Sequence, residues 1–202
     1  MKRLLVLPLV AAVAVSVWTT GGLAKPANLP VPCPWVINTG VTGPTPKWLG
    51  EIDIPRLGER VQFSRGTKAL FSGKEDNSVN HGPSLYPNDH GFGNMPGQGG
   101  TVGILGHRTT HTHPFCRFDL MEPGYVVMMQ VHQIRYTFRV VYIDQKTDPN
   151  SWAYFKHPGR YDRTPNAKGV PVQYLVLAAC TPPRYKNYRI NIVAKLVAVK
   201  RL

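Results

Sequence analysis

Residues 175–189, with the sequence LVLAACTPPRYKNYR, join two apolar segments through a short polar loop. The first segment ends at Cys180, and the second begins at Arg189. Apolar runs separated by a proline-containing loop are typical of neighbouring strands. If the two strands pair antiparallel, the loop brings Cys180 and Arg189 to the same end of the sheet. This stretch therefore predicts a sheet and a candidate site at its end.

Strand patterns continue through the chain from Trp48 onward. The segments are rich in Val, Ile and Tyr and are separated by Gly, Pro, Asn and Asp, which indicates strands. Only residues 67–72 and 114–121 are expected to form short helical turns, and residues 73–100 are expected to form a long loop. The predicted fold class is mostly β, a small barrel or sandwich. The expected strands are residues 101–106, 124–131, 134–144, 171–179 and 188–199.

The charge of the chain restricts its partners. The sequence has 202 residues, with 24 Lys and Arg against 11 Asp and Glu, which gives a net charge of +13. The basic residues are scattered in pairs, without a block, a helical stripe or a nucleic-acid-binding motif. An anionic surface, such as acidic lipid or an anionic cell wall, fits this pattern better than nucleic acid. We expect no nucleic-acid partner.

The N-terminal region indicates export. Residues 1–24 have a basic start, an apolar run and small residues at the end, as in a secretory signal. The apolar length also suits an uncleaved membrane anchor that leaves the rest of the chain outside the cell. Residues 25–47 contain six prolines, which favours an extended, semi-rigid spacer. We therefore expect a signal peptide or anchor (1–24), a spacer (25–47) and a folded domain (48–202) at the outer side of the cell membrane, or secreted if the signal is cleaved.

The chain contains three cysteines, Cys33, Cys116 and Cys180. In an oxidising compartment an odd number leaves at least one thiol unpaired or bonded to another molecule. A disulfide between Cys33 and Cys116 would tie the spacer to the domain and leave Cys180 free. A free cysteine is either a buried apolar residue or a nucleophile, and a nucleophile needs a nearby base or cation. Both roles are open for Cys180 at this point.

Residues that could activate Cys180 lie at predicted strand ends. His107 directly follows the apolar strand in TVGILGHR, whereas His132 and His157 lie at a strand boundary and in a loop. Arg189 could donate hydrogen bonds to the oxyanion that forms when a thiolate attacks a carbonyl. Arg184, in the same loop, is the alternative cation. The predicted site therefore combines a thiol, an imidazole and a guanidinium.

These motifs together resemble the sortases, the cysteine transpeptidases of Gram-positive cell surfaces, over about residues 48–199. The Thr pair after GHR and the Thr-Pro after Cys180 are most similar to class E members from high-GC Gram-positive bacteria. The matching segments occur in the order of the family: WLGEIDIPRLG (48–58), GTKAL (66–70), GILGHRTTHTHPF (103–115), MEPGYVVM (121–128) and LVLAACTPPRYKNYR (175–189).

The resemblance implies an eight-stranded β-barrel and chemistry without a cofactor or metal. Cys180 would attack the Thr–Gly carbonyl of an LPxTG-like or LAxTG-like sorting signal and form a thioester. His107 would protonate the leaving amine and then deprotonate the incoming amine, while Arg189 would stabilise the oxyanion. The implied substrates are surface proteins that carry a sorting signal, the implied acceptor is an amine of a peptidoglycan precursor or pilin, and a monomer is expected.

The sequence departs from the family at the pocket. Sortases usually carry TLxTC, whereas residues 176–180 are VLAAC and lack both threonines. Ala179 takes the place of the threonine that helps arrange substrate and oxyanion, and His111 stands where many class E relatives carry a tyrosine. With Arg184, these two are the substrate-binding candidates. A catalytically weak, sortase-like binding or scaffolding protein of the cell surface is the alternative function.

A metal site is the rival interpretation of the histidine-rich loop. His107, His111, His113 and Cys116 are metal-ligating residue types, and the first two have the i, i+4 spacing of a zinc-binding helix. A strand precedes them, no glutamate lies between them, and Pro114 interrupts any helix. We therefore expect no metal site, and we place His111 and His113 in a loop near the thiol.

Overall fold

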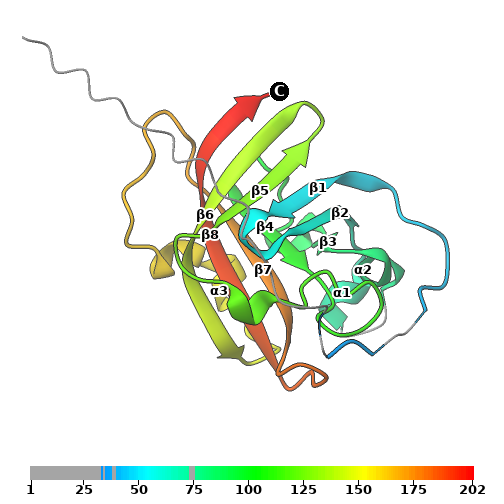
Figure 1. Cartoon of the computed structure of the whole chain (residues 1–202). Helices are drawn as coiled ribbons and strands as arrows, with labels where there is room; N and C mark the ends of the chain where they lie inside the picture. The colour runs from blue at the N-terminus through cyan, green and yellow to red at the C-terminus, as the bar shows by residue number, and fades with distance from the viewer. Residues whose placement is uncertain (1–32, 34, 38–39, 73–75) are drawn as a thin grey trace, which may run out of the picture.

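The computed structural model describes residues 33, 35–37, 40–72 and 76–202. Eight strands form a closed barrel in the order β1-β2-β3-β4-β7-β8-β6-β5 (Figure 1). The predicted fold class, mostly β with an eight-stranded barrel, is confirmed. The predicted signal or anchor, residues 1–24, lies outside the described residues. Within the described part, no helix combines the length and apolar character needed to cross a membrane.

The regular elements are mostly strands, and each helix is one or two turns long. The strands are β1 (Trp48–Ile54), β2 (Glu59–Arg65), β3 (Ser84–Leu85), β4 (Gly100–Leu105), β5 (Val126–Val131), β6 (Ile134–Thr147), β7 (Gln173–Thr181) and β8 (Tyr188–Arg201). The helices are α1 (Ala69–Ser72), α2 (Asn77–His81), α3 (Ala153–Lys156) and four 3-10 turns, η1 (Pro55–Leu57), η2 (Asn88–His90), η3 (Phe118–Leu120) and η4 (Pro158–Tyr161).

The part of the predicted loop 73–100 that the structure describes, residues 76–100, is more ordered than the sequence predicted. It contains α2, β3 and η2 rather than one long loop. Helix α2 begins because the Asp76 side chain accepts a hydrogen bond from the backbone N–H of Ser78 at 2.8 Å, which caps the helix N-terminus. The prediction of a loop was wrong here. A helix of only five residues is too short to show a helical pattern among so many Gly, Asn and Pro residues. The predicted turns at 67–72 and 114–121 correspond to α1 and η3.

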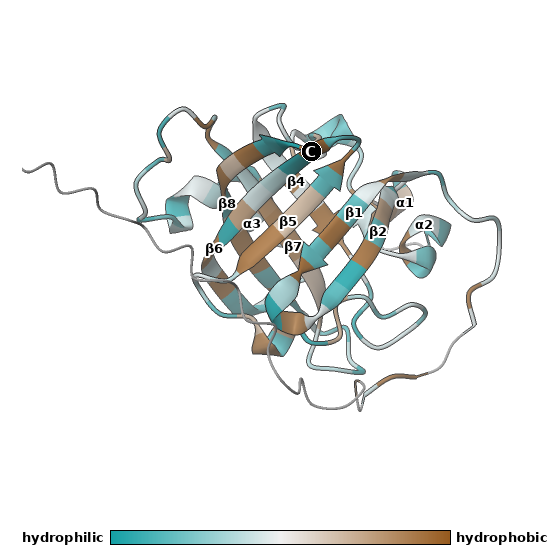
Figure 2. Cartoon of the chain, turned by 45° about the horizontal axis from the view of Figure 1, so that its top comes forward, coloured by the Kyte–Doolittle hydropathy of each residue, from teal (hydrophilic) through white to brown (hydrophobic). Residues whose placement is uncertain are grey.

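Strand β7 separates two hydrophobic clusters. Leu175, Leu177 and Ala179 face the barrel interior, whereas Val176 and Ala178 face an outer cluster on the other side of the sheet. This alternation follows from the two-residue period of a strand, and Figure 2 shows apolar residues along the neighbouring strands. The outer cluster also contains Leu70, Val79, Tyr86, Phe92, Tyr154, Phe155 and Val193.

The described part of the predicted spacer lies against the domain. Cys33 and Cys116 form a disulfide with a Cα–Cα distance of 6.1 Å. Near it, the Ile37 N–H donates a hydrogen bond of 2.7 Å to the Thr109 carbonyl, in the loop that follows β4. The disulfide and this hydrogen bond hold the N-terminal segment beside the histidine-rich loop.

Removal of the disulfide is expected to destabilise the domain. Replacing both Cys33 and Cys116 by serine should lower the free energy of unfolding by about 4 kcal/mol, because the bond closes a long loop in the unfolded chain. The two cysteines are separated by 83 residues. Denaturant unfolding of the two proteins measures the difference, and mass spectrometry without reductant checks the bond first. Free thiols at both positions, or equal stabilities, would contradict this expectation.

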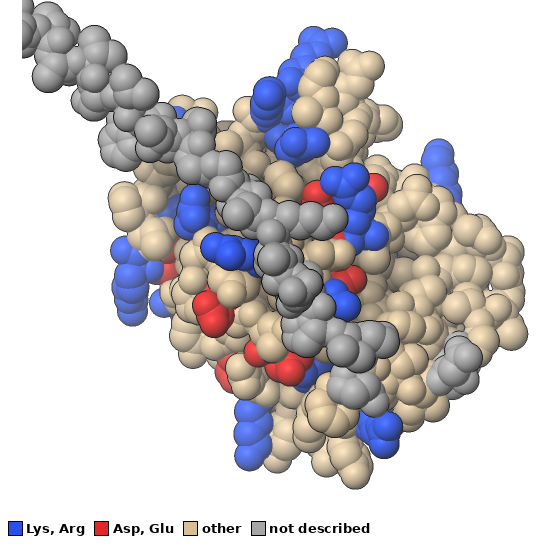
Figure 3. All heavy atoms as spheres, in the orientation of Figure 1, with Lys and Arg blue, Asp and Glu red and all other residues tan. Residues whose placement is uncertain are grey.

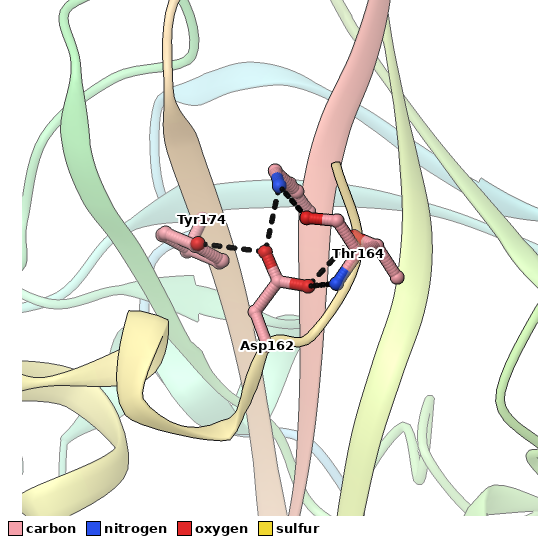
Figure 4. Close-up of polar contacts among 4 residues, drawn as sticks. Asp162, Thr164 and Tyr174 are labelled. Atoms are coloured by element: carbon pink, nitrogen blue, oxygen red, sulfur yellow. Dashed lines mark hydrogen bonds and ion pairs between the residues drawn. The ribbon is translucent and has the colours of Figure 1, made fainter. Parts of the chain in front are cut away.

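A buried ion pair fixes the segment between α3 and β7 to the sheet. Figure 4 shows Asp162 and the side chains that surround it. Lys195 on β8 forms an ion pair of 2.8 Å with Asp162, and both side chains are 3% exposed. The Tyr174 hydroxyl donates to Asp162 at 2.8 Å, and the Thr164 hydroxyl donates at 2.6 Å. Burial alone would raise the pKa of Asp162, but the hydrogen bonds from Lys195, Thr164 and Tyr174 lower it to about 2.

This ion pair predicts a loss of stability in acid. The folded-state pKa of Asp162 lies below that of an unfolded aspartate, so its stabilisation is complete above about pH 4 and disappears as the pH falls towards 2. We expect Asp162→Asn to have a lower melting temperature at pH 6 and a smaller further decrease between pH 4 and pH 2 than the wild type. Asp148→Asn, at an exposed turn, is the control. If the melting temperatures of the wild type and Asp162→Asn fell by the same amount between pH 4 and pH 2, the assignment would be wrong.

Candidate active site

Cys180 lies near the end of β7, and its thiol is free and partly buried. By strand alternation it shares the outer face of the sheet with Val176 and Ala178. Its Cα partner on the antiparallel strand β8 is Arg189. Directly opposed residues of an antiparallel pair project their side chains to the same face. The thiol and the guanidinium therefore belong to neighbouring positions on the outer face of the barrel.

His107 follows β4, which runs parallel to β7. In this pairing Leu105 lies beside Ala178, and the Gly106 N–H donates a hydrogen bond of 3.0 Å to the Ala178 carbonyl. Parallel strands end at the same edge of a sheet. Two residues after Leu105 comes His107, and two residues after Ala178 comes Cys180. The structure thus brings the three catalytic candidates to one edge, at the ends of the adjacent strands β4, β7 and β8.

The imidazole of His107 is held from both sides. Its Nε2 lies 2.8 Å from Asn80 Oδ1, on α2, and its Nδ1 lies 3.1 Å from the Thr110 hydroxyl. An amide oxygen only accepts, so the contact with Asn80 requires the proton on Nε2. The ring of His111 packs nearby, with 4.6 Å between the ring centroids. The Asp76 cap positions α2 and, through it, Asn80.

The side chain of Arg189 is held by hydrogen bonds to the loop before it. Its Nη1 donates to the carbonyls of Lys186 and Tyr188, at 3.3 and 3.2 Å. Tyr86, just after β3, lies within electrostatic reach of both Arg189 and Cys180. Burial raises the pKa of Tyr86 far above its usual value, the Arg189 cation opposes this shift, and Cys180 adds to it. The phenol therefore stays protonated, as a neutral group within electrostatic reach of the thiol and the guanidinium.

Two adjoining cavities lie on the outer face of the sheet, and we call the two together the groove. They have volumes of about 90 and 230 Å³ and share the side chains of Phe71 and Trp152. Arg189 lies in the wall of the first cavity. The first cavity is lined by Leu70, Phe71, Tyr86, Leu105, Pro149, Asn150, Ser151, Trp152, Phe155, Ala178, Arg189 and Asn191. The second is lined by Phe71, His90, Phe92, Trp152 and Lys156.

The substrate-binding candidates occupy different places. His111 lies beside His107 and has a left-handed backbone, with φ 52°. Ala179 is 0% exposed and faces the barrel interior, on the side opposite to the thiol. Arg184 is exposed, and its Nε donates to the Trp35 carbonyl at 3.4 Å. Only His111 is therefore packed against one of the three catalytic candidates.

The histidine-rich loop does not form a zinc-binding helix. His111 and His113 have positive φ values of 52° and 38°, and the loop consists of turns. Among the residues that the structure describes, no group of three or more His, Cys, Asp or Glu side chains is arranged to hold a metal ion.

The sortase domain family matches residues 52–197. The chain belongs to the sortase family. Two sortase structures share its barrel: sortase E1 from Streptomyces coelicolor, solved with a tripeptide in the active site, and sortase E from Streptomyces avermitilis. The first has a TM-score of 0.61 and 22% identity and covers 77% of this chain and 91% of its own. The second has a TM-score of 0.58 and 22% identity, with coverages of 79% and 93%.

The class E resemblance of this sortase also extends to a curated relative. Sortase SrtE1 of Streptomyces coelicolor is 28% identical over 100 residues, which are 48% of this chain and 27% of the relative. The matched segment thus spans about a quarter of that protein. The family and the class E likeness expected from the motifs are confirmed.

Several residues around the sortase site were not candidates from the sequence alone. They include Asn80, Tyr86 and Thr110, which surround His107, Cys180 or Arg189 in space. Asn80 lies in a segment that lacks any strand or helix periodicity, and Tyr86 follows a strand of two residues. Local sequence patterns carry no signal for Asn80 and Tyr86, because only the folded barrel brings them to the site, whereas Thr110 lies three residues after His107.

Proposed function

We propose that this sortase is a cell-surface cysteine transpeptidase. It cleaves an LPxTG-like or LAxTG-like sorting signal between Thr and Gly, and it transfers the protein to an amine of a peptidoglycan precursor or pilin. The observation that carries the proposal is the register of three adjacent strands, which sets Cys180 opposite Arg189 and leads the chain after β4 to His107 at the same edge. A thiol, an imidazole and a guanidinium suit acyl transfer.

In the first half-reaction, the Cys180 thiolate attacks the threonine carbonyl carbon. The C–S bond forms, and the carbonyl electron pair moves to the oxygen, which accepts hydrogen bonds from Arg189. When this tetrahedral intermediate collapses, the C–N bond to glycine breaks and His107 gives its proton to the leaving amine. The product is a thioester between threonine and Cys180, and His107 is left neutral.

In the second half-reaction, the acceptor amine attacks the thioester carbonyl. Neutral His107 removes a proton from the attacking nitrogen, and Arg189 again binds the oxyanion. The C–S bond breaks, which returns the Cys180 thiolate and the imidazolium. The acyl part of the substrate stays attached to the enzyme between the two steps. The groove that extends from Arg189 along the outer face offers a surface to hold it.

The proposed cellular setting follows from the rest of the chain. Residues 1–24 act as signal peptide or anchor, residues 25–47 as spacer and residues 48–202 as the catalytic domain at the outer side of the membrane. The charge of +13 suits an anionic surface. On the face in Figure 3, Lys and Arg lie in several separate places, in keeping with contact to an anionic surface.

An activity assay with the full chain tests this function. Peptides with LPxTG-like and LAxTG-like signals are incubated with an amine acceptor, and a thiol-reactive analogue of each signal is used for labelling. We expect a transfer product and an adduct at Cys180, located by mass spectrometry. Binding of the peptides without adduct or product would instead favour the surface-binding or scaffolding function.

The two arginines of the β7–β8 loop are expected to differ. Arg189→Ala should lower kcat/KM by about 10²-fold or more, because the oxyanion loses its cationic donor. Arg184→Ala should have a much smaller effect, since its guanidinium is directed to the Trp35 carbonyl. Peptide-transfer kinetics of the two variants measure the difference. Equal losses, or a larger loss in Arg184→Ala, would reverse the assignment.

A further inference from the structure

The second cavity of the groove is an aromatic pocket, defined by Phe71, His90, Phe92, Trp152 and Lys156. Its rings pack on one another: Phe92 and Trp152 are stacked with 5.6 Å between centroids, and Phe71 meets His90 edge-on at 4.2 Å. Mutual packing of this kind preforms a pocket. With a volume of about 230 Å³, the pocket has room for a large apolar side chain.

Lys156 gives this pocket a positive charge. The lining contains no acidic residue, and both Lys156 and His90 are solvent-exposed. The neighbouring carboxylate of Asp89 forms an ion pair of 3.0 Å with Lys68, so it is already engaged. A ligand with an apolar group beside a carboxylate would match both the rings and the charge.

We propose that the aromatic pocket is a specificity subsite for the sorting-signal polypeptide, a proposal that rests on the transpeptidase function above. The pocket binds an apolar side chain on the acyl side of the scissile bond, and Lys156 binds a carboxylate next to it. The acyl side is chosen because this part of the substrate must remain bound while the acceptor arrives. Its route along the first cavity leads past Trp152, whose side chain lines both cavities.

A charge-swap experiment tests the subsite. Sorting-signal peptides carry either Asp or Lys, placed at successive positions before the signal, and adduct formation at Cys180 is timed in the full chain. At one position, the wild type is expected to react two- to fivefold faster with Asp, in the range of an exposed ion pair. Lys156→Glu should reverse this preference. Lys200→Glu, at the far end of β8, should retain the wild-type preference.

Different results would contradict the subsite and the transpeptidase function on which it rests. The subsite is disproved if Lys156→Glu shows the same preference as the wild type while both form the adduct. Failure of the wild type to form an adduct with any peptide would disprove the transpeptidase function instead. As a second measurement, Trp152→Ala should raise KM about tenfold at nearly constant kcat, because the lost ring binds substrate away from the thiol. An unchanged KM in a folded Trp152→Ala protein also overturns the subsite.

A second inference concerns Arg108, the residue directly after His107. Its side chain is buried, at 3% exposure. Its Nη1 donates a hydrogen bond of 3.0 Å to the hydroxyl of Thr181, the residue directly after Cys180. Its Nη2 forms an ion pair of 3.0 Å with Asp119, on η3. One guanidinium therefore joins the two segments that carry the proposed base and the proposed nucleophile.

We infer that Arg108 is a positioning residue that fixes the spacing between His107 and Cys180. This ion pair gives little net stability, because the Asp119 side chain is 46% exposed and solvent screens its charge, while desolvation of the buried guanidinium offsets the remaining attraction. The planar guanidinium instead provides donors in fixed directions, and these hold two backbone segments at a set distance. Small displacements of a base relative to a nucleophile have large effects on rate.

Arg108→Met is compared with Arg117→Met. Arg117 also forms an ion pair, with Glu59 at 3.4 Å, and it donates to the Leu57 carbonyl at 2.6 Å, so these contacts do not join the segments of His107 and Cys180. We expect Arg108→Met to lower kcat by tenfold or more with little change in KM. Arg108→Lys should recover part of the loss. Arg117→Met should keep the wild-type kcat even if its melting temperature falls.

The inference is wrong if Arg108→Met retains the wild-type kcat, or if both variants lose activity only in proportion to their melting temperatures. Thr181→Val provides a milder test if Arg108→Met does not fold. It removes the hydroxyl that accepts from Arg108 while it keeps the shape of the side chain. A folded Thr181→Val protein should also show a lower kcat at similar KM, and a wild-type kcat would refute the positioning role.

Discussion

Cys180→Ala is expected to reduce both adduct formation and peptide transfer to background. The thioester requires a bond to sulfur, and the structure leaves no other free thiol, because Cys33 and Cys116 form the disulfide. The variant should fold normally, since alanine already occupies the two preceding positions of β7. Its affinity for the signal peptide should stay within about twofold, because the walls of the groove are intact.

Mass spectrometry and equilibrium binding of the Cys180→Ala protein check these outcomes. The combination of lost chemistry and retained binding is the diagnostic result. Residual transfer above background, or an adduct at another residue, would show that Cys180 is not the nucleophile. Transfer by neither protein, with equal peptide binding, would support the scaffolding function.

His107→Ala is expected to lower kcat/KM by about 10²- to 10⁴-fold, the usual contribution of a general acid and base. The imidazole handles a proton in both half-reactions, and Asn80 and Thr110 hold it at this strand end. Thiol labelling by a small, uncharged alkylating reagent should be affected much less, since it needs no protonation of a leaving amine.

His132→Asn is the matched control for this variant. His132 lies in the turn between β5 and β6 with φ 52°, a backbone conformation that asparagine tolerates. Its activity should equal that of the wild type in the same peptide-transfer assay. If His107→Ala retained near-wild-type turnover, or if both variants lost activity equally, the imidazole of His107 would have no part in the chemistry.

Local sequence determined a large part of the fold. Apolar segments rich in Val and Ile, bounded by Gly and Pro, located β4 to β8, because strand formation depends on side chains that alternate between two faces. The pairing of β7 with β8 could also be predicted from the sequence, since a short loop between two strands favours an antiparallel hairpin. The position of Cys180 relative to Arg189 follows from this hairpin alone.

The position of His107 relative to Cys180 depends on the barrel. Strands β4 and β7 are parallel, and parallel strands need a long crossover, so no turn signal between them reveals the pairing. The order of the motifs suggested the site, but the register that aligns Leu105 with Ala178 is a tertiary feature. Ala179 faces the core rather than the groove because side chains alternate between the two faces along β7.

The sequence by itself thus determined the fold class, the hairpin that carries Cys180 and Arg189, and the histidine that follows β4. Only the tertiary structure decided which side chains surround them: Asn80 on His107, Arg108 on Thr181, and Tyr86 near the thiol. The physical reason is the distance along the sequence over which each kind of interaction acts. Strand and turn preferences act between residues close in sequence, whereas these contacts join residues that only the closed barrel brings together.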